Sequence, residues 1–317
     1  MVNRRTFLHT GASCAAHLLW MSSAAGPAAR RLFAMAPAGR VVAQEPWGRL
    51  EQVGEGLWAM ISTPLAGERG GPAWRTLCNG GIVAGRSDVL AIEAFASAEG
   101  ARWLADEALR LTGRRPTVGL VTHFHGDHCG GLAGYAAEGW AVRVRSTGAT
   151  RDLLGEREPL PEASLPATGA TTTIDLGGRT VRVTSRTGHT ASDVTIEVDD
   201  PRIVWCGDLV WHGMFPNYVH ATPSQKARGV RALLAEADTR YVPGHGNMAT
   251  RADVERYLAL LDDVETKARG AIERGDPVDQ AADAYAIPPA LGEWVMFSPR
   301  YFRVAFQAWA RELGGTQ

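Results

Sequence analysis

The feature that most constrains this chain is a short segment crowded with metal-binding side chains, Thr122–His128, which reads THFHGDH. Three histidines and one aspartate in so short a loop are hard to explain without a metal ion, and this ligand set suits zinc, iron or manganese. An apolar run over residues 116–121 precedes the loop and predicts a buried strand. The chain therefore predicts a rigid metal site at the end of a strand.

Further candidate ligands stand beside glycines in short polar loops that adjoin β-rich runs: His189, Asp208 and His245. Five of the seven histidines outside a predicted leader lie in such glycine-flanked loops, which chance does not readily produce. Because one metal ion needs three or four ligands, we expect these loops to share a site. His212 and His220 lack this frame and are predicted to be surface or pocket-lining histidines.

In their order along the chain, these motifs resemble the metallo-β-lactamase superfamily: HxHxDH, Gly-His-Thr, Gly-Asp and Pro-Gly-His-Gly, from about Leu57 to His245. The resemblance implies an α+β fold, an αββα four-layer sandwich with C-terminal helices and a two-metal site in a cleft at one edge. It implies two zinc ions per chain, with iron or manganese as alternatives. It also implies the ligands: His123, His125 and His189 for the first metal, Asp127, His128 and His245 for the second, and Asp208 as the bridge.

The resemblance implies a mechanism as well. Two closely spaced dications lower the pKa of a shared water toward about 7, so that a metal-bridging hydroxide can attack a carbonyl group. Asp127 is expected to orient the hydroxide and move the proton, and Asp208 to fix the metal spacing. The expected reaction is hydrolysis of a lactone, ester, thioester or amide. β-Lactam hydrolysis is expected to be weak, because true β-lactamases of the superfamily usually carry Cys or Ser at the position of Asp208.

The sequence leaves other functions open. The main alternative is an oxidoreductase that resembles the mononuclear iron sulfur dioxygenases. A glutathione thioesterase ranks lower because its substrate is cytosolic, and a nuclease because the stretch between Asp208 and His245 has no room for an extra domain. A non-catalytic binding module is least expected, since all seven ligands are present. Glu93 stands where many members carry an aspartate that supports the metal site.

The N-terminus is predicted to be a leader outside the fold. Arg4 and Arg5 precede a modestly hydrophobic stretch, which resembles a twin-arginine export signal. Cleavage is expected after Ala36 or Ala43, and the mature protein is expected in the periplasm or outside the cell. The predicted division of the chain is residues 1–43 (export signal and linker), 44–250 (metallo-β-lactamase-fold domain) and 251–317 (C-terminal helical extension packed on the same domain).

Composition limits the partners. A formal net charge of −1 argues against a nucleic-acid surface. No stretch after the leader is long and apolar enough to anchor the mature protein in a membrane. We expect a small-molecule substrate, and the sequence leaves the oligomeric state open. Four aromatic residues in loops near the expected cleft suggest either an apolar pocket or simple packing: Trp74, Trp211, Phe215 and Tyr218.

Periodicity and turn signals predict the main elements. In the first half we expect a linker over residues 26–45, one strand over 53–63, strands over 76–83 and 89–92, a helix over 98–111 that ends at Gly113, and a helical stretch from the ligand loop through Glu138. In the second half we expect hairpins over residues 172–185 and 193–206, a helix over 224–237 and a strand over 240–242. After a helix over 252–272, the aromatic segment 290–313 predicts a lid, a dimer face or a packed terminal helix. Cys78, Cys129 and Cys206 are expected to be small buried side chains.

Overall fold

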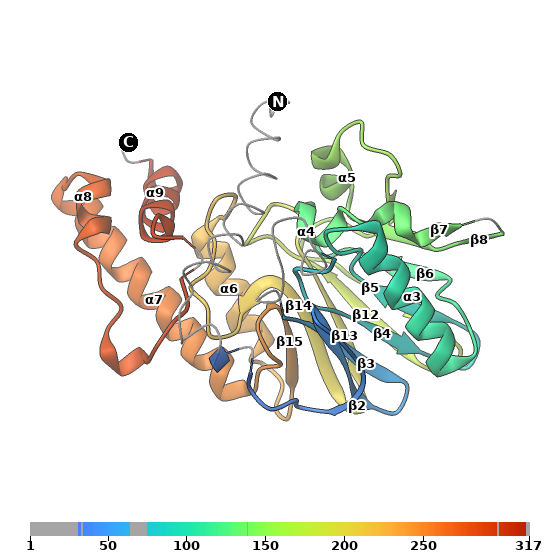
Figure 1. Cartoon of the computed structure of the whole chain (residues 1–317). Helices are drawn as coiled ribbons and strands as arrows, with labels where there is room; N and C mark the ends of the chain where they lie inside the picture. Colours follow the sequence, from blue (N-terminus) through green and yellow to red (C-terminus); the bar gives the residue numbers. More distant parts are fainter. Residues whose placement is uncertain (1–30, 33, 64–74, 138, 297, 315–317) are drawn as a thin grey trace.

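The computed structural model describes residues 31–32, 34–63, 75–137, 139–296 and 298–314. Two sheets face each other, and helices cover the outer side of each (Figure 1). The first sheet has the order β1-β2-β3-β4-β5-β6-β9-β10. Its strands are β1 (Arg40–Glu45), β2 (Gly48–Gly54), β3 (Leu57–Ser62), β4 (Gly80–Ala84), β5 (Val89–Ile92), β6 (Val118–Leu120), β9 (Arg143–Ser146) and β10 (Glu162–Ala163).

The second sheet has the order β11-β12-β13-β14-β15, antiparallel up to β14 and parallel between β14 and β15. Its strands are β11 (Thr171–Asp175), β12 (Thr180–Ser185), β13 (Val194–Asp199), β14 (Arg202–Trp211) and β15 (Arg240–His245). A small ribbon pairs β7 (Ala136–Ala137) with β8 (Trp140–Ala141). The helices are α3 (Ala98–Thr112), α4 (Gly126–Cys129), η2 (Leu132–Tyr135), α5 (Gly148–Leu154), α6 (Pro223–Leu233), α7 (Arg251–Arg274), α8 (Val278–Asp283), η3 (Pro289–Leu291) and α9 (Tyr301–Leu313).

Three apolar clusters fill the spaces between these layers. One lies between the sheets and joins, for example, Leu90 of β5 to Ile196 of β13. A second lies between the first sheet and the buried face of α3, which includes Leu104. The third lies between the second sheet and helices α6, α7 and α9. This order of layers confirms the predicted α+β fold class and the αββα sandwich.

Local signals explain the two long helices. Helix α3 begins after Ser97, whose side chain accepts a hydrogen bond from the backbone N–H of Gly100, and it ends at Gly113. The predicted helix and its end at Gly113 are therefore confirmed. Helix α7 begins with a capping box between Thr250 and Asp253, which satisfies backbone N–H groups of its first turn.

Two predictions of local elements in the first half of the chain are wrong. The single strand expected over residues 53–63 is an antiparallel pair, β2 and β3, joined by the turn Glu55-Gly56. The helix expected after the loop stops at Cys129 and gives way to the short helix η2. A Cβ atom at Gly131 would lie 2.1 Å from the backbone oxygen of Ala94, so the chain here packs against the segment after β5. Glu138 lies outside the described residues.

The linker expected through residue 45 is also wrong, because Arg40–Glu45 forms β1 and pairs with β2. The backbone N–H groups of Ala38 and Gly39 donate to Glu51 Oε2 at 2.7 and 3.0 Å. The predicted division between residues 43 and 44 thus falls inside a strand of the first sheet. The leader over residues 1–30 lies outside the described residues.

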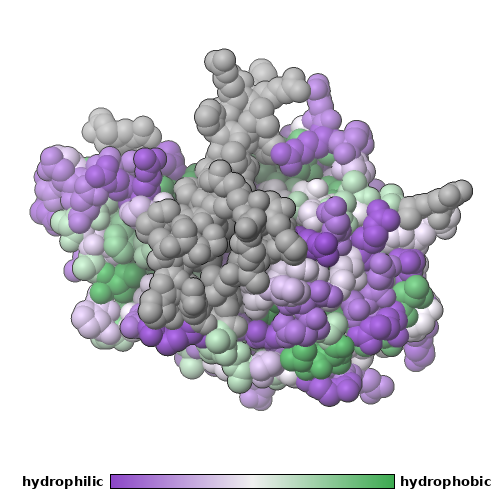
Figure 2. Space-filling view, viewed as in Figure 1, coloured by the Kyte–Doolittle hydropathy of each residue, from purple (hydrophilic) through white to green (hydrophobic). Residues whose placement is uncertain are grey.

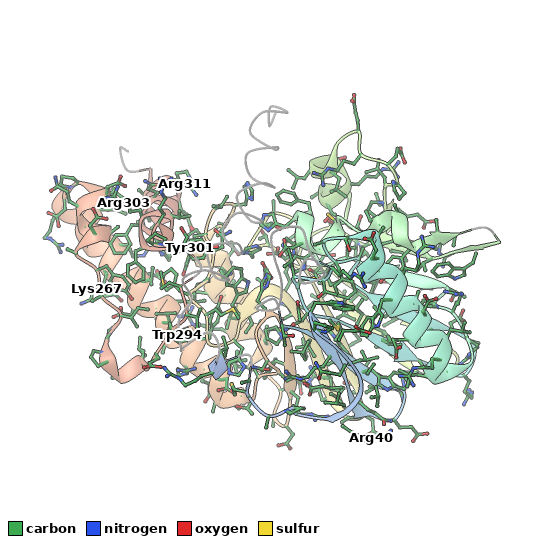
Figure 3. All side chains as sticks on the ribbon, viewed as in Figure 1. Arg40, Lys267, Trp294, Tyr301, Arg303 and Arg311 are labelled. Atoms are coloured by element: carbon green, nitrogen blue, oxygen red, sulfur yellow. The ribbon has the colours of Figure 1, made fainter. Side chains whose placement is uncertain are left out.

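The C-terminal segment is not one continuous apolar helix. Gly292 follows η3, Pro299 precedes α9, and the intervening described residues are irregular. On α9, the buried residues Phe306 and Trp309 share a cluster with Val210 of β14, which favours a packed terminal helix. Figure 2 shows a hydrophilic outer surface over α8 and α9, and Figure 3 places Arg303 and Arg311 at that end, far from Arg40 on β1. Among the described residues, no helix is both long and apolar enough to cross a membrane.

Candidate metal centre

The structure brings all seven predicted ligands together in two groups: His123, His125, His189 and Asp208 in the first, and Asp127, His128 and His245 in the second. Within each group, the candidate donor atoms lie within 4.8 Å of one another. All seven residues are at most 8% exposed. Buried polar side chains of this kind need partners, so their convergence requires an explanation.

In the first group, inward-facing atoms have the spacing of a coordination shell. Nδ1 of His125 lies 3.0 Å from Nε2 of His123 and 3.0 Å from Nε2 of His189. Oδ2 of Asp208 lies 3.2 Å from Nε2 of His189 and 3.9 Å from Nε2 of His123. A tetrahedral zinc ion with metal–nitrogen distances of about 2.0–2.1 Å separates its ligand atoms by about 3.3 Å. The four donors therefore fit one metal ion.

The second group has a similar arrangement. Oδ2 of Asp127 lies 3.6 Å from Nε2 of His128 and 3.3 Å from Nε2 of His245. Oδ1 of Asp208 lies 3.2 Å from the same nitrogen of His128 and 3.3 Å from that of His245. Asp208 thus turns one carboxylate oxygen toward each group, which is the arrangement that a bridging ligand requires.

Two atoms between the groups test whether a metal fits. Nε2 of His128 and Oδ1 of Asp208 are buried, and neither has a hydrogen-bond partner among the described residues. Leaving buried polar atoms without a partner costs free energy. A cation bound by both atoms removes that cost, so the residues present fit a metal ion in the second group as well.

Glu93 orients two of the candidate ligands. Its Oε1 lies 2.9 Å from Nδ1 of His128 and accepts a hydrogen bond from the hydroxyl of Thr122 at 2.5 Å. Because this hydroxyl donates to Glu93, it accepts from Nδ1 of His123, 3.0 Å away. Both histidines therefore carry a proton on Nδ1 and leave the lone pair of Nε2 for a metal. Glu93 thus provides the support for which the family often uses aspartate.

His245 and His125 have partners of other kinds. Nδ1 of His245 lies 3.1 Å from the backbone oxygen of Leu77, to which it donates. His125 turns Nδ1 inward, so its Nε2 carries the proton and donates to Nδ1 of His220 at 2.8 Å. His220 is half-buried and lies beside the ring of Phe124. The predicted pocket-lining histidine therefore contacts a ligand from outside the metal groups.

A buried lysine, Lys226 on α6, lies behind the remaining two ligands. Its Nζ donates to the backbone oxygen of Asp208 at 2.7 Å and lies 3.5 Å from Nδ1 of His189. Burial lowers the pKa of Lys226 to about 8, although Asp208 and Asp193 act to raise it. Asp193 also accepts from the backbone N–H of His189 at 2.8 Å and so fixes the loop that carries this histidine.

The protonation states suit metal binding. Burial lowers the pKa of His123, His125 and His189, that of His125 to about 3, so these imidazoles are neutral at physiological pH. Burial acts to raise the pKa of Asp208, but neighbouring histidines, first His245, hold it well below its ordinary value. Burial acts to lower the pKa of His245, but Asp208 and Asp127 raise it to about 9. The carboxylates thus favour positive charge at this place.

The backbone around Asp208 differs from the prediction, because this residue lies within strand β14 and not in a loop. The register of β14 against β15 is irregular at Gly207, just before Asp208. On β15, a Cβ atom at Gly244 would lie 1.9 Å from Oδ1 of Asp208. The glycine that precedes His245 therefore leaves the space that the Asp208 carboxylate occupies.

Other predicted candidates lie outside the metal groups. His212 is buried, with Nδ1 3.0 Å from the backbone oxygen of Asn247 and Nε2 3.5 Å from Asp253 at the start of α7. Phe215 and Tyr218 are buried in the cluster beneath α7 and α9, so their role is packing. Trp211 packs against His245, with ring centroids 4.6 Å apart. Trp74 lies outside the described residues.

The three cysteines in the described part of the chain are buried, as predicted, and all three are free. Cys129 donates to the backbone oxygens of Phe124 and His125, both at 3.1 Å. Burial raises the pKa of its thiol to about 12, which leaves it protonated at physiological pH. Cys129 therefore supports the ligand loop as a neutral side chain.

Sequence reasoning missed Thr122 as a relay and Lys226 altogether. A signal for Lys226 was present in the predicted helix. Lys226 shares a helical face with the apolar residues Ala227, Val230 and Leu233, all of which α6 buries. A lone lysine on a buried face indicates a specific partner.

Comparisons with known proteins agree with this geometry. The family model described as the metallo-beta-lactamase superfamily matches residues 76–263. The chain is 31% identical over 209 residues to the hydroxyacylglutathione hydrolase of Acidiphilium cryptum, which covers 65% of this chain and 80% of that protein. It is 31% identical over 180 residues to the hydroxyacylglutathione hydrolase of Albidiferax ferrireducens, over 54% of this chain and 66% of that protein.

Solved structures resemble the fold. A metallo-beta-lactamase from Pontibacter korlensis superposes with a TM-score of 0.57 and 20% identity, over 68% of this chain and 99% of that chain. A metallo-beta-lactamase from Erythrobacter litoralis gives a TM-score of 0.55 and 20% identity, over 70% and 99% of the two chains. The two donor groups, the family match and the related hydrolases lead to one conclusion: this chain belongs to the metallo-β-lactamase superfamily and is a metal-dependent hydrolase.

Proposed function

We propose that this protein is an exported binuclear zinc hydrolase that cleaves an activated acyl bond, with a thioester as the first substrate class to test. One observation carries the binuclear part of the proposal. Two complete donor sets converge, and Asp208 turns one oxygen to each of them. A mononuclear iron oxygenase needs only one such set, so the fully formed second set favours the hydrolase.

The choice of thioester rests on the relatives. The curated proteins that resemble this chain are named hydroxyacylglutathione hydrolases, and the match to one of them spans 80% of its length. These names concern the relatives, and the glutathione part of their substrate is a separate question for this chain. The shared chemistry that we adopt is attack of water on a carbonyl carbon with expulsion of a thiol; esters and lactones follow the same course.

The donor sets assign the metal ligands. His123, His125 and His189 would hold one zinc ion, Asp127, His128 and His245 the other, and Asp208 would contact both. When bound, the two ions supply a lowered pKa of water and polarisation of the substrate carbonyl. Glu93, Thr122 and the backbone oxygen of Leu77 hold a proton on Nδ1 of three histidines and so turn their Nε2 atoms toward the donor groups: His123, His128 and His245.

Asp127 is the residue that we assign to proton transfer. Its Oδ2 faces His128 and His245. The residue also lines an open cavity next to the site. Charges on His128 and His245 outweigh burial and lower the pKa of Asp127, so the carboxylate is ionised and can accept a proton. Oδ1 would take a proton from the attacking water and return it to the leaving sulfur. Water and thioester thus give a carboxylic acid and a thiol.

The test begins with metal content. The mature protein, purified without added metal, is expected to contain about two zinc ions per chain, measured by mass spectrometry of the elements. It is then assayed on an S-hydroxyacylglutathione, a simple acyl thioester, a lactone and a β-lactam. If the protein instead contains about one iron per chain, takes up oxygen and hydrolyses none of these substrates, the oxygenase function replaces the hydrolase function.

His125→Ala removes a donor of the first set and is expected to abolish turnover and most of the metal in that set. His212→Gln is the matched control, because His212 is also buried but lies outside both donor groups. A His125→Ala protein with full turnover would contradict the proposed site.

Export rests on the resemblance of the first residues to a twin-arginine signal, and β1 limits where the leader can be cut. A cut after Ala43 would remove most of β1 and the N–H groups that bind Glu51. A cut after Ala36 leaves β1 intact. We therefore expect the mature protein to begin at or before residue 37, and mass spectrometry of secreted material tests this. The twin-arginine route is supported if the protein is exported with Arg4 and Arg5 intact but stays inside the cell when both are replaced by lysine.

A further inference from the structure

A cavity of about 570 Å³ lies against the ligand loop and opens beside Asp127. Its volume is within the range of about 300–1,000 Å³ that is typical of small-molecule sites. The cavity is formed by Leu77, the residues just before α3, helices α4 and η2, the end of α5 and the residues that follow α5. Of the seven candidate ligands, Asp127 lines it. The cavity therefore adjoins the second donor group, and nothing assigned so far uses it.

The inner wall of this cavity is apolar. Leu77, Leu132 and Leu154 line it, and each is at most 7% exposed, so packing holds these side chains in place. Two smaller apolar residues also line the cavity: Ala96, which is half-buried, and Ala133, which is exposed. The charged lining residues other than Asp127 are Arg157 and Glu158, and both are exposed at the rim. An apolar wall that leads to one carboxylate suits a chain of carbon atoms with a reactive group at its end.

Two features tie the cavity to the metal centre. Leu77 has a left-handed backbone with φ 65°, and its oxygen accepts from His245, so a wall residue also fixes a candidate ligand. A non-glycine residue in this conformation is strained, and such strain is retained mainly at functional sites. At Gly126, between His125 and Asp127, a Cβ atom would meet nothing within 4 Å. Gly126 also lines the cavity, so a larger side chain at this position would enter open space beside Asp127.

We propose that this cavity binds an apolar chain attached next to the scissile bond, and that it selects substrates by the length of that chain. The inference rests on the proposed function for the chemistry but on the cavity for the specificity. The same apolar chain could belong to the acyl group or to the leaving thiol. The substrate series, and not the protein variants, distinguish a chain on the acyl group from a chain on the thiol.

The experiment narrows the cavity with Gly126→Leu and, at a second lining residue, with Ala133→Leu. Gly148→Leu is the matched control: Gly148 is also the first residue of a short helix, its Cβ would also meet nothing within 4 Å, and it does not line the cavity. Metal content is measured for every variant, because Gly126 lies between two candidate ligands. Ala133 is not adjacent to a ligand, so this second variant keeps the test valid if Gly126→Leu loses metal.

The first readout is binding of decanoate to the zinc-loaded protein by titration calorimetry, which needs no turnover. The dissociation constant is expected to rise about 10-fold or more in both cavity variants, as burial of two or more methylene groups is lost, and to stay unchanged in Gly148→Leu. Decanoate that binds equally to all four proteins, or to none of them, would overturn the cavity assignment.

The second readout is kcat/KM for two series of thioesters. In one, the acyl group is lengthened from acetyl to decanoyl on a constant thiol; in the other, the thiol is lengthened on a constant acetyl group. Wild-type kcat/KM is expected to rise by up to about fourfold per buried methylene in one series, and the cavity variants to flatten that rise. The series that responds identifies the acyl or the thiol source.

The two proposals fail in different ways. If thioesters are hydrolysed but kcat/KM does not depend on chain length in either series, the proposed role of the cavity is rejected and the proposed reaction is retained. Decanoate binding that the cavity variants weaken, with no hydrolysis of any acyl compound, would retain the cavity and reject the proposed reaction.

Discussion

The candidate ligands beside the two sheets are supported by opposite charges. Beside the first sheet, the carboxylate of Glu93 orients His128 directly and His123 through Thr122. Beside the second sheet, the ammonium group of Lys226 on α6 lies behind His189 and donates to the backbone of Asp208. A carboxylate behind an imidazole makes it a better metal ligand, whereas an ammonium group disfavours positive charge nearby.

This difference in charge indicates that Glu93 and Lys226 support the candidate metal site in different ways. Glu93 would contribute affinity, because its charge favours a cation in each donor group through one histidine of that group. Lys226 would contribute position, because it fixes the backbone of Asp208, which faces both groups, while its charge opposes a bound cation. Four substitutions, ordered from the largest expected effect to the smallest, test this comparison.

Asp208→Asn is expected to have the largest effect, because this residue serves both sheets. The amide loses the negative charge and one acceptor oxygen between the donor groups. We expect kcat/KM to fall by more than about 100-fold, beyond the range for a supporting residue, with loss of metal from both groups. Asp199→Asn, on an exposed strand end with surface ion pairs, is the control. Two bound metals and normal turnover in Asp208→Asn would break the model of a shared site.

Glu93→Gln tests the support in the first sheet. Loss of the carboxylate charge is expected to weaken metal binding by about 10- to 100-fold, measured by competition with a chelator of known affinity. The control is Glu51→Gln, because Glu51 is an equally buried glutamate that pairs with Arg49 away from the metal groups. If both variants weaken metal binding equally, the effect of Glu93 is a general loss of stability.

Lys226→Met tests the support in the second sheet. The substitution removes the donor to Asp208 but also a positive charge close to the metal ions, so the two effects partly cancel. We expect metal affinity to change by less than about 10-fold, less than for Glu93→Gln, and the spectrum of the cobalt-substituted protein to shift as Asp208 moves. A loss of metal affinity as large as that of Glu93→Gln would contradict the proposed difference between the sheets.

Asp253→Asn lies outside both supports and is expected to change stability alone. Hydrogen bonding from His212, with that from Thr250, holds the pKa of Asp253 well below its ordinary value. A depressed carboxyl pKa stabilises the fold above the unfolded pKa, about 3.9, and this contribution is lost as the pH falls through the lower pKa of the folded state. We expect a loss of about 1 kcal/mol at neutral pH, typical of a helix cap, that shrinks only as the pH falls below about 4 toward the folded-state pKa, measured by chemical denaturation. Metal affinity should stay unchanged.

Much of the site could be predicted from the sequence, because its information is local. The spacing of His123, His125, Asp127 and His128 lies within one loop, and the order of the later motifs identified a family. The end of α3 at Gly113 could be predicted for the same reason, since a glycine after an amphipathic run is a local stop signal. Conversely, the strand predicted over residues 53–63 runs across the turn between β2 and β3, because a two-residue turn is a weak local signal.

The residue types and their order along the chain were thus enough to predict three things: a histidine- and aspartate-rich site, an αββα sandwich and a family. Only the tertiary structure decided what stands behind the ligands. It brought Lys226 from α6 to Asp208, placed His220 against His125 and formed the cavity that Gly126 and Asp127 line. These contacts join residues far apart in the chain and depend on how sheets and helices pack, so no local pattern encodes them.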